Sequence, residues 1–366
     1  MKPTEFVTVN GQFWAEHLKG VAEHLPASHG RELPGPLLYP RLMVLTETPD
    51  WNILELVGVS REYRSLEVRR QKVRSVEEYF GLGEGPAVVD LPGQNLFKDA
   101  TIATEAGRHE LDGRFPTAAK LIGEEYVGPG DQLLAFAPGN YSTFERTLLV
   151  HTANDSTRLH WTFFAIAIHR SEPADKYLDF LRTYNNARPH LDPIGTLSVP
   201  APDLKGAPFA STYLAHGLQD STVDQFLDAN ESILLSAFDA TRLVRQPDLG
   251  DLQPDFILER ADGSHIVGQL GLPVADTSNG KKRRRAFRST VAEGSVQLAK
   301  YAEYFDNADN RAAAQSKYDV DVTAPRKLLI IPSQELVPAA DLAGAGAGVE
   351  VVDYDTILRL HIAASA

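Results

Sequence analysis

Cysteine is absent from this chain of 366 residues. That absence excludes disulfide frameworks, thiolate zinc sites and cysteine nucleophiles together. Long apolar runs are missing as well, because no stretch approaches the roughly 20 apolar residues that a membrane-spanning helix needs. Residues 1–30 contain no apolar segment of the kind found in secretory signals. We therefore expect a cytoplasmic protein that has no membrane partner.

Positive charge is also scarce, since 36 Lys and Arg residues stand against 49 Asp and Glu residues. The resulting net charge of -13, with His neutral, excludes a uniformly basic coat for nucleic acid but allows a local basic patch. Hydrophobic residues make up 43% of the chain, which is ordinary for globular proteins. The composition thus predicts packed cores rather than disorder.

Proline residues divide the chain near its middle. Residues 188–205 contain Pro189, Pro193, Pro200 and Pro202, and this density is typical of a linker. We therefore expect an α+β region with a regulatory or sensing role over residues 1–215 and a second domain over residues 216–366. In the first region, a hairpin at 147–152 and 158–168 and a helix at 174–185 are the clearest elements. No motif there identifies a ligand, and its three hairpin histidines fit packing or surface positions: His151, His160 and His169.

The second region has the pattern of an α/β domain. We expect a helix from Ser221 or Thr222 to Phe238, and then a β-hairpin at 254–260 and 264–272 around an Ala-Asp-Gly loop. A basic loop, a helix from about 291 to 306, strands at 327–331 and 349–352 and a helix at 354–363 follow. This order predicts a mixed sheet flanked by helices.

The hairpin places three residues on one face. A three-residue loop pairs Arg260 with Ser264, so that Asp255 faces Gln269. Because side chains alternate with a period of two along a strand, Asp255, Gln269 and Gly271 share one face at the open end of the hairpin. A register slip of one residue would remove this alignment.

The ordered segments of this region resemble the C-terminal domain of Shedu anti-phage immune nucleases, which belong to the PD-(D/E)xK superfamily. In that superfamily, one hairpin strand carries Pro-Asp and the next carries Asp or Glu, any residue, and Lys. The resemblance covers roughly residues 220–360 and rests on FLDANESILL, PDFIL, the strand ending in LP, RRRAFR, EGSVQLAKYAEYF, KLLIIP and VEVVDYDTIL, in that order. It implies a restriction-endonuclease-like fold, metal-assisted phosphodiester hydrolysis, a homo-oligomer and a role in sensing or processing phage DNA.

The catalytic motif implied by the resemblance is degenerate. Asp255 matches the first carboxylate, whereas Gln269 stands at the second acidic position and Gly271 at the Lys position. The amide of Gln269 carries no negative charge, and Gly271 has no side chain that could orient water or stabilise charge. We therefore expect Asp255 to be at most a remnant Mg²⁺ ligand, and cleavage to be weak or absent.

Substitute residues could complete a working site. Glu231 and Asp228 on the preceding helix are the first candidates, and Glu231 is the weaker of the possible metal ligands. Glu259, Asp276 and the two lysines Lys281 and Lys282 are the others. For each of them a solvated surface position is the alternative interpretation.

Two further features fit a nucleic-acid site. Gln297 and Tyr301 lie four residues apart, hence on one helical face, and the resemblance implies that both turn toward the site. Six cations within eight residues form a local positive field suited to backbone phosphates, with salt bridges in an oligomer as the alternative. These cations are Lys281, Lys282, Arg283, Arg284, Arg285 and Arg288.

Three functions remain open at this level. The first is a Shedu-type defence protein that binds DNA but cleaves it weakly or not at all, with an unknown phage-derived trigger or protein partner. The second is an active Mg²⁺-dependent endonuclease that uses substitute residues or another subunit. The third is a non-catalytic scaffold for assembly or protein interaction.

Overall fold

The protein is described by a computed structural model. It describes residues 1–24, 37–38, 40–58, 66–80, 101–102, 113–115, 138–139, 141–153, 156–187, 195–196, 220–271, 280–331, 346 and 348–365. Within these ranges only the backbone is described at 21–24, 37–38, 77, 80, 101–102, 142, 144–153, 156, 184–187, 195–196, 220–222, 280–287, 362–363 and 365. No helix in these ranges is both long and apolar enough to cross a membrane.

A mixed sheet of eleven strands forms the centre of the molecule. Its strands run in the order β4-β2-β3-β7-β13-β12-β11-β10-β9, with β6 beside β7 and β5 beside β6. In chain order the strands are β2 (Leu42–Glu47), β3 (Trp51–Val57), β4 (Glu67–Lys72), β5 (Thr101–Ile102), β6 (Ser142–Ala153), β7 (Ser156–His169), β9 (Ala240–Arg245), β10 (Phe256–Arg260), β11 (His265–Leu270), β12 (Arg326–Ile331) and β13 (Val349–Asp353). A separate pair is formed by β1 (Leu37–Leu38) and β8 (Gly195–Thr196).

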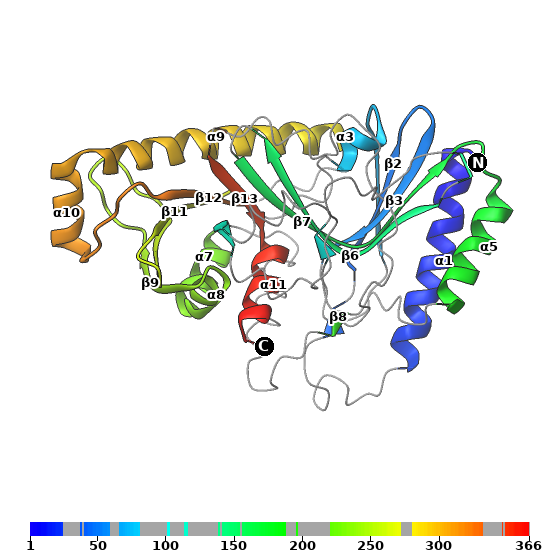
Figure 1. Cartoon of the computed structure of the whole chain (residues 1–366), viewed down its shortest axis with the longest axis horizontal. Coiled ribbons are helices and arrows are strands. Elements are labelled where there is room, and N and C mark those ends of the chain that lie inside the picture. The colour runs from blue at the N-terminus through cyan, green and yellow to red at the C-terminus, as the bar shows by residue number, and fades with distance from the viewer. Residues whose placement is uncertain are drawn as a thin grey trace.

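Helices cover both faces of the C-terminal strands (Figure 1). The helices α7 (Asp220–Ala229), α8 (Ser232–Ala237) and α11 (Tyr354–Ser365) pack on one face with Phe256 and Leu258. The helices α9 (Gly280–Asp306) and α10 (Ala308–Tyr318) pack on the other face with Ile257. Because consecutive strand residues point to opposite faces, this arrangement buries β10 on both sides.

At the other end of the sheet, α1 (Pro3–His24) lies beside α5 (Ala174–Ala187). Phe6 and Trp14 of α1 are buried against the sheet, and Tyr177 of α5 donates a hydrogen bond to Asn10 at 2.7 Å. The short helix α3 (Val76–Phe80) follows β4.

The two predicted hairpins are confirmed. Phe256 pairs with Gly268 and Glu259 with His265, which is the register that a three-residue loop requires. Gly263 in that loop has a φ of 79°, a left-handed conformation that glycine adopts without strain. The strands β6 and β7 form the N-terminal hairpin, and α5 follows them as predicted.

Other boundaries differ from the prediction. The helix α9 begins at Gly280 rather than near residue 291, so the basic run lies in its first turns and not in a loop. The single helix predicted up to Phe238 is interrupted after α7, where the side chain of Asn230 donates to the carbonyl of Phe226 at 2.9 Å. The elements α1, α10 and β9 were not predicted. The sequence of β9 carries two arginines and no alternation of apolar residues, so it does not have the pattern of a strand.

The strands on both sides of residue 215 belong to the same sheet. The strand β13 pairs in parallel with β7, through Glu350 with Thr157 and Val351 with Arg158. Arg326 on β12 also forms a bidentate ion pair with the buried Glu350, at 2.7 and 2.6 Å. The predicted boundary at 215 lies outside the described residues.

Candidate functional site

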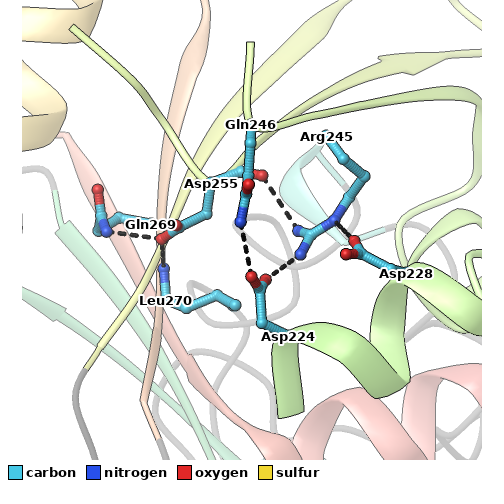
Figure 2. Close-up of polar contacts among 7 residues, drawn as sticks. All are labelled: Asp224, Asp228, Arg245, Gln246, Asp255, Gln269 and Leu270. Atoms are coloured by element: carbon cyan, nitrogen blue, oxygen red, sulfur yellow. Dashed lines mark hydrogen bonds and ion pairs between the residues drawn. The ribbon is translucent and has the colours of Figure 1, made fainter. Parts of the chain in front are cut away.

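Asp255 lies just before β10 and its carboxylate is the centre of a polar cluster at the open end of the hairpin (Figure 2). One oxygen, Oδ2, accepts hydrogen bonds from the side-chain amide of Gln269 at 2.6 Å and from the backbone N–H of Leu270 at 2.6 Å. Hydrogen bonds to a charged acceptor are among the stronger ones in proteins. The two residues that the sequence placed opposite each other are therefore in direct contact.

Tyr301 on α9 completes this cluster. Its hydroxyl oxygen lies 3.0 Å from Oε1 of Gln269 and 3.2 Å from the backbone carbonyl of Gln253, and these two acceptors share its single proton. Burial, and next the negative charge of Asp255, raise the pKa of the Tyr301 hydroxyl, so it stays a neutral donor. Because a carboxylate can only accept, Gln269 turns its NH₂ toward Asp255 and its oxygen toward Tyr301.

Gly271, at the Lys position of the motif, is closely packed. Its backbone N–H donates to the carbonyl of Ile330 on β12 at 2.5 Å. A Cβ atom at this position would lie 3.0 Å from Cγ2 of Thr290 on α9 and 3.1 Å from both the Ile330 carbonyl and Cγ2 of Ile331. Any side chain at this position therefore requires Thr290 or β12 to shift by a few tenths of an ångström.

Arg245 at the end of β9 joins this cluster to helix α7. Its guanidinium donates to the backbone carbonyl of Asp255 at 3.1 Å and forms ion pairs with Asp224 and Asp228 (Figure 2). The side chain of Arg245 is only 11% exposed, so these acids hold a largely desolvated cation. The side-chain amide of Gln246 donates to the carboxylate of Asp224 at 2.7 Å, and its backbone N–H donates to the backbone carbonyl of Asp255 at 2.9 Å.

The sequence reasoning did not identify Asp224, Arg245 or Gln246. The available signal was the spacing of the two acids, because residues 224 and 228 lie one turn apart and so on one face of a helix. Their partner on β9 could not be recognised without knowing that a strand precedes the hairpin.

The substitute residues do not gather around Asp255 in the described structure. Asp228 is paired with Arg245, and Glu231 is an exposed residue at the start of α8. Glu259 lies at the far end of β10, opposite His265. Asp276 and the side chains of Lys281 and Lys282 lie outside the described residues.

The residues around Asp255 do not fit a Mg²⁺ ion in the observed arrangement. Gln269 presents donor hydrogens to the carboxylate, whereas a hard divalent cation needs several oxygen ligands. The amide of Gln269 would have to rotate before its oxygen could join Asp255 in binding a metal. Within the described residues, no three His, Asp or Glu side chains are grouped to hold a metal ion.

The basic run, Gln297 and Tyr301 follow one another along α9. Gln297 lies one helical turn before Tyr301, as the spacing predicted, and its side chain is exposed. Residue 285 precedes Tyr301 by sixteen residues, which is about 24 Å along a helix. The N-terminal end of α9 extends toward the N-terminal half of the molecule, where α9 contacts β4 (Figure 1). The structure thus places the basic run away from the Asp255 cluster.

A second polar cluster lies inside the N-terminal half. The buried side chain of Glu55 contacts Nε2 of His160 at 2.6 Å and accepts a hydrogen bond from the hydroxyl of Tyr79. Arg158 lies 3.4 Å from the other ring nitrogen of His160. His160 is therefore held by protein groups in the interior of the sheet region.

Comparisons with known proteins find no match: no family model, no curated protein and no solved structure is similar to this chain.

Proposed function

We propose that this chain is a defence protein of the Shedu type that binds DNA through a nuclease-like C-terminal region and cleaves it weakly or not at all. The proposal includes the finer assignment of residues 216–366 to the restriction-endonuclease-like fold. Assembly as a homo-oligomer and a phage-derived trigger sensed by residues 1–215 belong to the same proposal.

The observation that carries the proposal is the hydrogen-bonded contact between Asp255 and Gln269. Two positions that a metal nuclease would use for charged ligands lie side by side at the open end of the hairpin, and Tyr301 reaches them from α9. The same contact argues against efficient hydrolysis, because the amide replaces one negative charge and saturates an oxygen that a metal would need. Gly271 supplies no lysine ammonium either, and a Cβ atom there would lie 3.0–3.1 Å from Thr290 and β12.

Binding is supported by the position of the basic run. Six cations lie within eight residues in the first turns of α9, in a chain whose net charge is -13. Lys and Arg residues near a helix N-terminus interact unfavourably with the helix dipole, so this cluster does not serve the stability of α9. Backbone phosphates are the partners that such a field attracts.

A titration of the purified protein with labelled DNA tests this proposal. We expect a mobility shift that weakens as salt rises, with a slope of log K against log salt close to -0.9 for each phosphate contacted. Reversal of the charges at Arg283, Arg284 and Arg285 to Glu should reduce the magnitude of that slope by about 3. The matched control is charge reversal at Lys176 and Arg182, two exposed cations of α5.

The same titration, repeated with Mg²⁺ or EDTA on a denaturing gel, separates the alternatives. Cleavage that requires both Mg²⁺ and Asp255 would show an active endonuclease. Absence of any salt-dependent shift would overturn the proposal and favour a scaffold. Light scattering of each variant reports whether the charge reversal has changed the oligomeric state instead.

A further inference from the structure

The outer face of α9 carries an exposed apolar side chain at its centre. Val296 is 57% exposed, and Val68 is the other exposed large apolar residue in the described part of the chain. Ala292 lies four residues before Val296 and Ala299 three residues after it, so the three form one line along the helix. Because a single exposed valine is ordinary on a protein surface, the residues around it must show whether this face binds a partner.

The charges beside this line are complementary to themselves. Glu293 and Lys300 are both exposed, and they lie seven residues apart, which places them on the same flank of the face. If a second copy of α9 is turned end over end about a two-fold axis near Val296, Glu293 lies opposite Lys300 of that copy. The symmetry repeats this pair with the roles exchanged. Glu293 also accepts from Ser289 at 2.6 Å, but a carboxylate has capacity for further donors.

The order of charges along the whole helix favours the same antiparallel arrangement. The first turns of α9 carry the basic run, whereas the exposed acids Glu303 and Asp306 lie near its C-terminal end. A parallel copy would place two basic runs at the same level, where they repel. An antiparallel copy places each run at the level of the other copy's acids, and it also aligns the helix dipoles favourably. Two acids do not neutralise six cations, so each run keeps positive charge for phosphates.

We propose that the outer face of α9 is a docking surface for α9 of a second copy of this chain, with the two helices antiparallel and the two-fold axis near Val296. The inner side of α9 packs on β11 and β12, and its outer side lies along one edge of the molecule (Figure 1). The inference rests on the proposed function in one respect, because it names the surface that forms the homo-oligomer included there.

The first test places a charge at the centre of this surface. Wild type should sediment as a dimer, or as a multiple of a dimer, over a series of concentrations in analytical ultracentrifugation. Val296→Asp should sediment with half that mass, because two carboxylates would meet near the axis. Valine and aspartate have similar helix propensities and Val296 is exposed, so the fold should be retained. The matched control is Thr183→Asp, which changes an exposed β-branched residue of α5 and should leave the mass unchanged.

The second test exchanges the two flanking charges. Lys300→Glu alone places a carboxylate opposite Glu293 of the second copy at two places in the dimer. The dissociation constant should therefore rise by about 10-fold. The double variant Glu293→Lys with Lys300→Glu restores both opposite-charge pairs, so its dissociation constant should return close to that of wild type. Where the two residues do not face each other across an axis, the second change restores nothing.

The inference is overturned if wild type is a monomer, if Val296→Asp keeps the wild-type mass, or if the double variant associates as weakly as Lys300→Glu. These outcomes are separate from the DNA-binding part of the proposed function. A monomeric wild type that still gives a salt-dependent shift with DNA overturns the docking surface and leaves DNA binding in place. A dimer that is lost in Val296→Asp but gives no shift with DNA supports the docking surface and overturns the proposed function.

Discussion

Gln269 is the residue that changes the chemistry of the site most. Its amide bridges Asp255 and Tyr301, and it keeps the geometry of a paired site without the second charge. A carboxylate of the same length at this position would face Asp255 directly.

Gln269→Glu should make stability depend on divalent cations. In EDTA at neutral pH, we expect a loss of about 1–3 kcal/mol, because two carboxylates repel and a hydrogen bond is lost. Mg²⁺ should restore much of this loss, since two carboxylates can share the ion. Urea unfolding with and without Mg²⁺ measures both effects. Gln269→Met loses the bond without adding charge, so it should not respond to Mg²⁺; an equal response in both variants would contradict this account.

Gly271→Ala should destabilise the fold by about 1–3 kcal/mol, because its methyl group would approach Thr290 and β12 within 3.0–3.1 Å. Thermal or chemical unfolding measures the change. Gly11→Ala in α1 is the opposite control, since no atom lies within 4 Å of its added Cβ. That substitution should stabilise the protein by up to about 1 kcal/mol through helix propensity. A stable Gly271→Ala protein would show that the lysine position is still open.

Among the elements, β9 connects the hairpin to α7. Arg245 of β9 forms ion pairs with Asp224 and Asp228 of α7, and it donates to the backbone carbonyl of Asp255. The position of Asp255 therefore depends on α7, β9 and β10 together. The site is therefore not a property of the hairpin alone.

Arg245→Ala should destabilise the protein by about 2–4 kcal/mol, because it leaves Asp224 facing a half-buried region without its cation. Hydrogen exchange should show the loss concentrated in α7 and at the start of β10. Arg182→Ala is the matched control, since its side chain is 62% exposed and its ion pair with Asp179 is 3.9 Å long. Exposed pairs of this kind contribute at most about 1 kcal/mol. Equal effects of the two substitutions would show that Arg245 does not anchor the site.

At the scale of the whole molecule, α9 connects the Asp255 cluster to the N-terminal half. It packs on β11 and β12 and, toward its N-terminal end, on β4 (Figure 1). Residue 285 of the basic run and Tyr301 are sixteen residues apart, which is about 24 Å along one helix.

Under the proposed function, this separation predicts a minimum length of DNA. A duplex must extend about seven base pairs, at roughly 3.4 Å each, to reach both ends. Affinity measured against duplexes of increasing length should therefore rise sharply once a duplex can span both contacts. A smooth dependence on length, with no such threshold, would mean that one end of α9 binds alone.

The sequence by itself determined what depends on short spacings. A three-residue loop fixes which residues face each other in the hairpin, so the contact of Asp255 with Gln269 could be predicted, and a spacing of four placed Gln297 and Tyr301 on one helix face. Only the tertiary structure decided what surrounds those residues. The close packing at Gly271 comes from Thr290 and β12, and the anchoring of Asp255 comes from Arg245 and α7. The shared sheet comes from two residue pairs between β7 and β13. These contacts join segments far apart in the chain, and local periodicity carries no information about which distant atoms fill the neighbouring space.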